Sequence, residues 1–182
     1  MKLWFYIIVG LQVLFLVGEA VSNQIKLATG RTVILRTAPV DPRSLFMGNY
    51  MALSYDISSI DPRISAPGQA IPKLQPGAAV YVGLAKRGGI HEPVDVLTYL
   101  PPANEVDPTV VYLRGTVTGH WGQRTQVEYG LERYYIPETR QAEVNRLQWG
   151  RQPVRMTVEV AVASDGTGRI RHVLVGGKPL GF

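Results

Sequence analysis

Residues 47–55 read MGNYMALSY and join a proline-containing approach segment to a strand pattern. In an extended chain every second side chain lies on the same face. One face of this stretch and its continuation is apolar and consists of Met51, Leu53, Tyr55 and Ile57, while the other carries Tyr50, Ala52, Ser54 and Asp56. We therefore expect Leu53 and Tyr55 to pack in the core and Tyr50 to meet solvent or a partner.

Two residues just before this strand, Gly48 and Asn49, favour a turn. Glycine has no Cβ, and asparagine tolerates a left-handed φ while its side chain can hydrogen-bond the nearby backbone. Gly48 and Asn49 are therefore expected to shape the entry into the strand. Together with Leu53 and Tyr55 they form a predicted structural motif.

Seven further segments are rich in β-branched and apolar residues and are bounded by turn formers. They are residues 32–37, 78–85, 94–99, 109–118, 124–131, 155–163 and 169–175. The last two predict a hairpin that turns at 164–166, with Met156, Val158, Val160 and Val162 facing inward. Gly115 predicts a bulge or bend, and one short helix is expected at 138–148. The pattern predicts a mainly β domain, an antiparallel barrel or sandwich of about eight strands.

The N-terminus is apolar from residue 3 to residue 18 except for Gln12, and it lies between Lys2 and Glu19. A soluble helix would not be apolar on every side. As a helix these residues span about 24 Å, and two further apolar residues extend them toward the ~30 Å hydrocarbon core. Residues 1–21 are therefore predicted to be a transmembrane anchor that contacts membrane lipid through residues 3–21.

A cleaved signal peptide is the alternative, because Gly18-Glu19-Ala20 has the small-x-small pattern of a cleavage site. The protein would then be secreted. Either interpretation exports residues 22–182 as a single β-rich domain. With Lys2 inside, an anchored chain crosses the bacterial inner membrane once and places this domain in the periplasm.

Composition narrows the function classes. The chain has no cysteine, so it offers no disulfide, thiolate metal site or cysteine nucleophile. Its formal net charge is +5, but the arginines are spread along the chain instead of forming the clustered footprint of a nucleic-acid-binding protein. We therefore expect no nucleic-acid partner.

Three stretches carry a resemblance to a known family: GNYMALSY at 48–55, VDPRSLF at 40–46 and EYGLERYYIPE at 128–138. The first resembles the signature of the GDYXXLXY family of bacterial proteins, and the others are similar to further parts of that family. The resemblance implies a membrane-anchored, largely β extracytoplasmic domain that works beside a polytopic membrane protein. The family's Asp is Asn49 here, which cannot act as a base or bind a cation with net charge.

A polar-aromatic groove is the predicted binding site, because a strand that turns at Pro137 can gather such groups in one cleft. Its candidate residues are Tyr50, Glu128, Tyr129, Glu132, Arg133, Tyr135 and Glu138. The groove would suit an extended peptide or a glycan. The interpretation that the pattern favours over a groove is that the charged residues pair on the surface and the tyrosines pack.

Catalytic candidates are sparse. A serine-lysine peptidase would need Ser44 beside Lys86, which sits in a turn where a protonated amine is the default. The histidines, among them His172 on the predicted face of Ile170 and Leu174, show no metal-ligand spacing. We predict no catalytic residue, metal or cofactor. The sequence favours a non-catalytic binding or accessory module for an integral membrane protein or cell-envelope component, with a peptidase-like hydrolase as the alternative.

Overall fold

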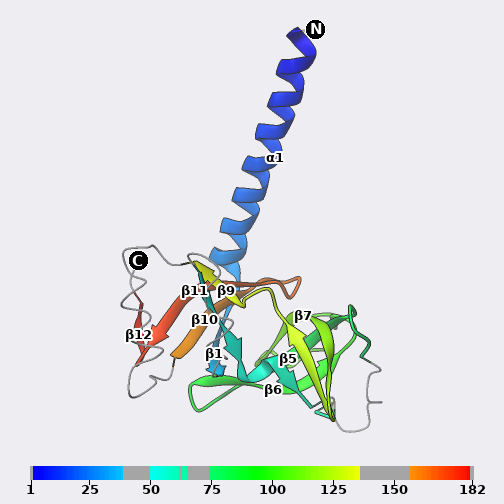
Figure 1. The fold of residues 1–182 in the computed structure, drawn as a ribbon, viewed down its shortest axis with the longest axis vertical. Helices are drawn as coiled ribbons and strands as arrows, with labels where there is room; N and C mark the ends of the chain where they lie inside the picture. Colours follow the sequence, from blue (N-terminus) through cyan, green and yellow to red (C-terminus); the bar gives the residue numbers. More distant parts are fainter. Residues whose placement is uncertain (1, 39–49, 62, 65–73, 136–155, 181–182) are drawn as a thin grey trace.

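A long N-terminal helix leaves one end of a β domain (Figure 1). The computed structural model describes residues 2–38, 50–61, 63–64, 74–135 and 156–180. The predicted turn residues Gly48 and Asn49, together with Ser44, Glu138 and the helix expected at 138–148, lie outside these ranges.

Helix α1 spans Lys2–Thr29, and its 28 residues cover about 40 Å at a rise of 1.5 Å per residue. Large apolar side chains are exposed along it from Trp4 to Ile25. The segment Trp4–Thr29 is long and apolar enough to cross a membrane. The helix continues about two turns beyond residue 21, where the anchor was expected to end. These last turns reach the β domain.

The first five-stranded sheet has the order β12-β11-β10-β1-β3. Its strands are β1 (Arg31–Ala38), β3 (Ser54–Tyr55), β10 (Met156–Val162), β11 (Gly168–Val175) and β12 (Lys178–Pro179), and each pairs antiparallel with its neighbours. The predicted C-terminal hairpin is confirmed as β10 and β11, and all four of the residues predicted to face inward from β10 are buried.

The second five-stranded sheet has the order β4-β8-β7-β5-β6. Its strands are β4 (Ser59–Ile60), β5 (Ala79–Arg87), β6 (Ile90–Leu97), β7 (Val110–Trp121) and β8 (Arg124–Glu128), again antiparallel throughout. A separate ladder joins β2 (Tyr50–Ala52) to β9 (Arg133–Tyr135), and a 3-10 turn, η2 (Asp56–Ser58), follows β3.

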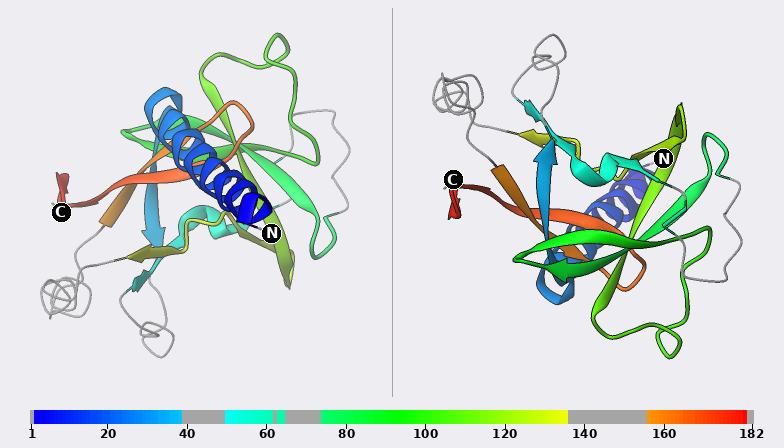
Figure 2. Two further views of the ribbon diagram at one scale, coloured as in Figure 1. Left: turned by 90° about the horizontal axis from the view of Figure 1, so that it is seen from above. Right: turned by 90° about the horizontal axis from the view of Figure 1, so that it is seen from below.

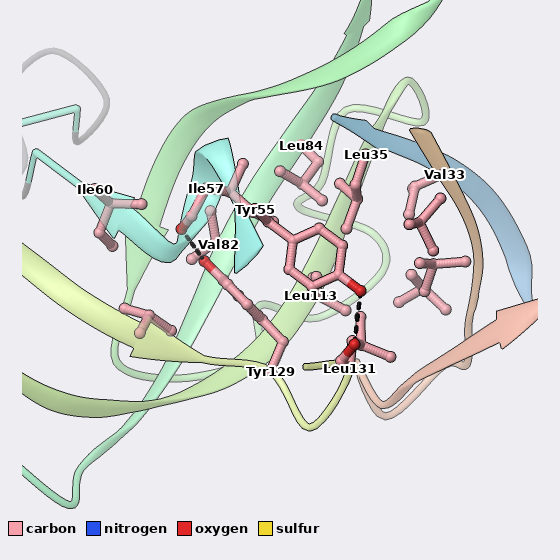
Figure 3. Packing of buried hydrophobic residues seen from close by; sticks show 14 of the residues in the cluster. Val33, Leu35, Tyr55, Ile57, Ile60, Val82, Leu84, Leu113, Tyr129 and Leu131 are labelled. Carbon is pink, nitrogen blue, oxygen red and sulfur yellow. Dashed lines mark hydrogen bonds between the residues drawn. The ribbon is translucent and has the colours of Figure 1, made fainter. Parts of the chain in front are cut away.

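The two larger sheets share one apolar core, to which both contribute fully buried side chains. Val33, Leu35, Val158 and Val160 come from the first sheet, and Val82, Leu84 and Leu113 come from the second. Tyr55 lies among them (Figure 3). The predicted mainly β class is confirmed. Among the described strands the sheets do not close into a barrel, so the sandwich is the form that the arrangement fits.

The β5–β6 hairpin extends toward β1 when the molecule is viewed from below (Figure 2, right). At this meeting point the Ile34 backbone N–H donates to His91 Nδ1 at 3.0 Å. Ile34 pairs in register with Glu159 in the first sheet, whereas His91 belongs to β6 of the second sheet. His91 therefore joins the two sheets through a neutral imidazole acceptor.

Several predicted strand ends were wrong. β6 begins at Ile90 instead of residue 94, because Gly88 and Gly89 both have positive φ and turn the chain within two residues. β7 continues to Trp121, so the turn into β8 is made at Gly122 and Gln123. β8 ends at Glu128 instead of residue 131.

Gly115 does not form the predicted bulge. It pairs in regular register with Val80, and the irregularity in β7 lies between Val117 and Gly119. A Cβ at position 115 would come within 2.4 Å of Val127 Cγ1. The glycine is needed for this close packing.

The predicted shared face of His172 and Ile170 was also wrong. The register of β10 and β11 shifts between Glu159 and Val160, which leaves Arg171 as an extra residue between the two pairs. Ile170 packs against the core, whereas His172 is exposed. The bulge changes which side chains point inward.

Candidate binding face

Two buried tyrosines connect the stretch around residues 50–57 to the stretch around residues 129–135 through hydrogen bonds (Figure 3). The Tyr55 hydroxyl donates to the Leu131 carbonyl at 2.7 Å, and the Tyr129 hydroxyl donates to the Ile57 carbonyl at 2.7 Å. Burial, followed by the nearby charge of Glu132, raises the pKa of both phenols. Both therefore remain neutral donors. We call this pair of bonds the tyrosine clamp.

Backbone pairing extends the tyrosine clamp. The Leu53 N–H donates to the Glu132 carbonyl at 2.8 Å, and the Tyr129 N–H donates to Glu132 Oε1 at 2.6 Å. The β2–β9 ladder then aligns Tyr50 with Tyr135 across the two strands. Two sequence stretches about 75 residues apart thus form one rigid unit. Its apolar side includes Leu53 and Tyr55, both buried as the alternation indicates.

The outer side of this unit presents the tyrosine–arginine face, which consists of Tyr50, Arg133 and Tyr135. The two tyrosine rings meet edge to face with centroids 6.1 Å apart, and Arg133 Cζ lies 5.7 Å from the centroid of the Tyr50 ring. This is the geometry of a cation–π contact. Tyr135 keeps 73% of its surface exposed. Rigid aromatic side chains next to a guanidinium are typical of protein interaction sites.

A hollow of about 440 Å³ adjoins the tyrosine–arginine face. We call it the β9–β11 hollow, and its lining residues are Gly130, Leu131, Arg133, Tyr134, Tyr135, Arg169 and Ile170. Tyr134 is half-buried and packs toward the core, and burial raises its pKa. The hollow combines two guanidinium groups with tyrosine rings and an apolar floor.

The structure brings together only part of the predicted groove. Tyr50, Arg133 and Tyr135 lie side by side, whereas Tyr129 is buried in the core and Glu132 is engaged by the Tyr129 N–H. Glu128 is exposed at the end of β8. Arg169 was missed by the sequence analysis, because only the tertiary fold brings β11 beside β9 and no local pattern marks it.

The end of α1 is fixed to the β10–β11 hairpin by three cationic side chains. Lys26 Nζ lies 3.1 Å from Asp165 Oδ2, and Arg169 Nη2 lies 3.2 Å from Asn23 Oδ1. Arg171 Nε donates to the Leu27 carbonyl at 3.1 Å, which satisfies an acceptor at the helix C-terminus.

Asp165 is the acidic partner in this junction. Partial burial acts to raise its pKa, but hydrogen bonds from Thr167 and Lys26 outweigh burial and lower the pKa to about 2. Asp165 therefore stays ionised, and its ion pair with Lys26 persists, at every pH well above that value. The junction orients the domain relative to the helix.

Of the candidate serine-lysine pair, the structure describes only the lysine. Lys86 is exposed and pairs in register with His91, while Ser44 lies outside the described residues. His120 is held by Thr125 Oγ1 and the Leu74 carbonyl. No group of three or more His, Cys, Asp or Glu is placed to hold a metal ion among the described residues.

Comparison with known proteins identifies the chain at the level of its family. No curated protein and no solved structure matches it significantly. The family model for GDYXXLXY proteins matches residues 12–173. The matched region includes both stretches that meet in the tyrosine clamp, and the chain therefore belongs to the GDYXXLXY protein family.

Proposed function

We propose that the chain is a membrane-anchored extracytoplasmic binding module that uses its tyrosine–arginine face to contact an integral membrane protein or a cell-envelope component. The observation that carries this proposal is the position of the face. Strand β9, which supplies Arg133 and Tyr135, lies at the end of the domain from which α1 leaves (Figure 1). A partner in or on the same membrane would meet this end first.

The proposed topology follows from the sequence and the helix together. Residues 1–21 anchor the chain in the bacterial inner membrane, and residues 22–182 form one domain in the periplasm. The length and exposed apolar side chains of α1 support the anchor. The last two turns of α1 pack on the domain through Asn23 and Lys26. Cleavage after Ala20 would leave only these two turns of the helix attached to the domain. We therefore favour retention of the anchor over secretion after cleavage.

The rigid construction of the face supports a binding role. The tyrosine clamp and the β2–β9 ladder hold Tyr50 and Tyr135 in place before any partner arrives. Preorganised aromatic side chains lose little conformational entropy on binding. The composition of the face, two tyrosines beside an arginine, is that of a recognition surface.

Site-specific photocrosslinking in native membranes tests the proposal. A photoreactive residue at Tyr135 of the full-length chain is expected to give a discrete adduct with a protein or envelope polymer. The same residue at Tyr99, which is exposed on another part of the domain, is the control and is expected to give none. Adducts of equal yield at both positions, or none at Tyr135, would contradict the proposed function.

Topology is tested separately. Because the chain has no cysteine, Lys178→Cys supplies a unique thiol at an exposed position. A membrane-impermeant maleimide is expected to label it in cells with a permeabilised outer membrane. Intact mass measurement of the membrane-extracted protein should show the N-terminal segment still attached. Labelling only after lysis of the inner membrane would contradict the periplasmic placement.

A further inference from the structure

We propose that the β9–β11 hollow binds the phosphodiester headgroup of an anionic phospholipid at the membrane surface. The inference rests on the proposed function in one respect, since it requires α1 to lie in a membrane. It adds a ligand class and a site that a protein-binding role does not require. The occupant is a lipid of the surrounding bilayer.

The position of Asn23 along α1 gives an estimate of how deep the hollow lies in the membrane. The part of α1 from Trp4 to Val21, which is apolar except for Gln12 and Glu19, is about 26 Å long at 1.5 Å per residue, close to the ~30 Å hydrocarbon core. Asn23 lies about 3 Å farther along the helix axis. The headgroup layer on each side of a bilayer is about 5–7 Å thick. Asn23 therefore lies in the headgroup layer.

Arg169 connects the hollow to Asn23 and therefore places both at the same depth in the membrane. Its Nε and Nη2 atoms lie 3.3 Å and 3.2 Å from Asn23 Oδ1. Arg169 also lines the hollow, together with Arg133 and Tyr135 of β9. Strands β9 and β11 both lie at the helix end of the domain (Figure 1). Arg169 thus places one wall of the hollow next to Asn23, and we infer that the hollow lies at the level of the lipid phosphates.

The charge of the hollow favours an anion. Among the described residues neither Arg133 nor Arg169 lies within 4.0 Å of a carboxylate. The hydrogen bonds of Arg169 go to two neutral oxygens, Asn23 Oδ1 and the Gly168 carbonyl. A planar guanidinium has five N–H donors and can donate two of them to a phosphate. Arg169 uses three on Asn23 and Gly168 and therefore keeps two. Two such groups around one hollow are complementary to a phosphodiester.

The remaining lining suits the rest of a lipid molecule. Tyr135 is largely exposed, and tyrosine rings concentrate at the membrane interface because they combine an apolar ring with a polar hydroxyl. Ile170, which is only partly buried, provides apolar surface for the glycerol backbone and first acyl carbons. Exposed apolar side chains of α1, from Trp4 to Ile25, are available to the acyl chains of the surrounding lipid.

Native mass spectrometry of the detergent-solubilised full-length chain tests the site. Equal amounts of phosphatidylglycerol and phosphatidylcholine are added, and the ratio of the two retained lipids is measured. We expect the wild type to retain phosphatidylglycerol preferentially. Arg133→Gln and Arg169→Gln should each lower this ratio about fivefold, the change that corresponds to about 1 kcal/mol per cation at an anionic surface. Equal retention by the wild type would overturn the proposal.

Two control variants separate lipid binding from other effects. Arg87→Gln removes an exposed guanidinium from the β5–β6 turn and should leave the ratio unchanged. Asn23→Ala removes the partner of Arg169 on the helix but keeps both cations, so the preference should persist. If Asn23→Ala abolishes the preference while Arg133→Gln does not, helix docking explains it and the lipid site is wrong.

A competition experiment with a soluble phosphate ester distinguishes a lipid headgroup from a free phosphate as the ligand. Excess glycerol 3-phosphate should not displace phosphatidylglycerol, because the apolar lining and α1 contribute only to binding of the lipid. Complete displacement would overturn the lipid assignment in favour of a soluble phosphate ester. The crosslinking experiment at Tyr135 scores only adducts with a protein or envelope polymer, and the small mass of a lipid adduct distinguishes these adducts from lipid binding. A specific protein adduct without lipid preference would refute the lipid site and leave the proposed function standing, and the reverse result would refute the protein partner.

Discussion

The hydroxyl groups of Tyr55 and Tyr129 point in opposite directions across the same junction, and each donates to a carbonyl of the opposite stretch. A buried carbonyl without a donor is costly, so each bond helps to keep the two stretches in one register. The last tyrosine of the motif is therefore a structural residue in this protein. Tyr50, by contrast, presents its ring on the outside, in contact with Arg133.

Tyr55→Phe and Tyr129→Phe should each lower the free energy of unfolding by about 1–2 kcal/mol, because each leaves a buried carbonyl unpaired. Chemical denaturation of the detergent-solubilised chain measures the change. Tyr99→Phe, at an exposed position, is the matched control and should change stability by less than about 0.5 kcal/mol. Effects of the two buried substitutions as small as that of the control would show that the clamp does not stabilise the fold.

At the scale of elements, two contacts join parts of the fold that strand pairing does not connect. The β5–β6 hairpin meets β1 through the hydrogen bond from the Ile34 N–H to His91. The α1 helix meets the β10–β11 hairpin through Lys26, Arg169 and Arg171. The strands themselves were largely predictable from β-branched alternation, but these contacts between elements were not, because no local pattern encodes them.

The contact at His91 predicts a dependence of stability on pH. Burial is the main cause that lowers the pKa of His91 below its usual value near 6.5, and the charges of Lys86 and Arg31 also lower it. The folded state therefore favours the neutral ring, whose Nδ1 accepts the Ile34 N–H. This contribution is complete above about pH 6.5 and is lost as the pH falls through the lowered pKa.

Thermal unfolding between about pH 8 and pH 5 measures the effect, in the range where histidine changes charge. The wild type should lose stability on acidification. His91→Asn keeps an acceptor for the Ile34 N–H but cannot titrate, so its melting temperature should fall less over the same range. His172→Asn, at an exposed position, is the control and should retain the wild-type dependence. Identical pH profiles for wild type and His91→Asn would contradict the assignment.

At the scale of the whole molecule, the docked helix end determines which face of the domain meets the membrane. A domain on a flexible tether would present all faces equally. Here α1 runs without a break into Thr29 and is bonded to the β10–β11 hairpin, so its axis and the β9 end of the domain are held together. The tyrosine–arginine face and the β9–β11 hollow depend on this orientation for their proposed roles.

Spin labels on the chain reconstituted in lipid nanodiscs should report this orientation. The absence of native cysteine allows a single label at Tyr135→Cys or at Arg87→Cys. A relaxing metal chelated to lipid headgroups should broaden the label at position 135 strongly and the label at position 87 weakly. A flexible four-residue Gly-Ser insertion after Thr29 should reduce this difference. Equal broadening at both positions in the uninterrupted chain would contradict a fixed orientation.

The sequence by itself determined the apolar N-terminal helix, the mainly β class, the C-terminal hairpin and the inward side of the Met51–Ile57 alternation. These follow from local periodicity and from the solvation of apolar side chains, which act over a few residues. The tertiary structure alone decided that Tyr129 is buried, that the bulge at Arg171 turns His172 outward, and that Arg169 reaches the helix. These features depend on contacts between segments far apart in the chain, whose geometry is set by how two sheets and a helix pack around one core.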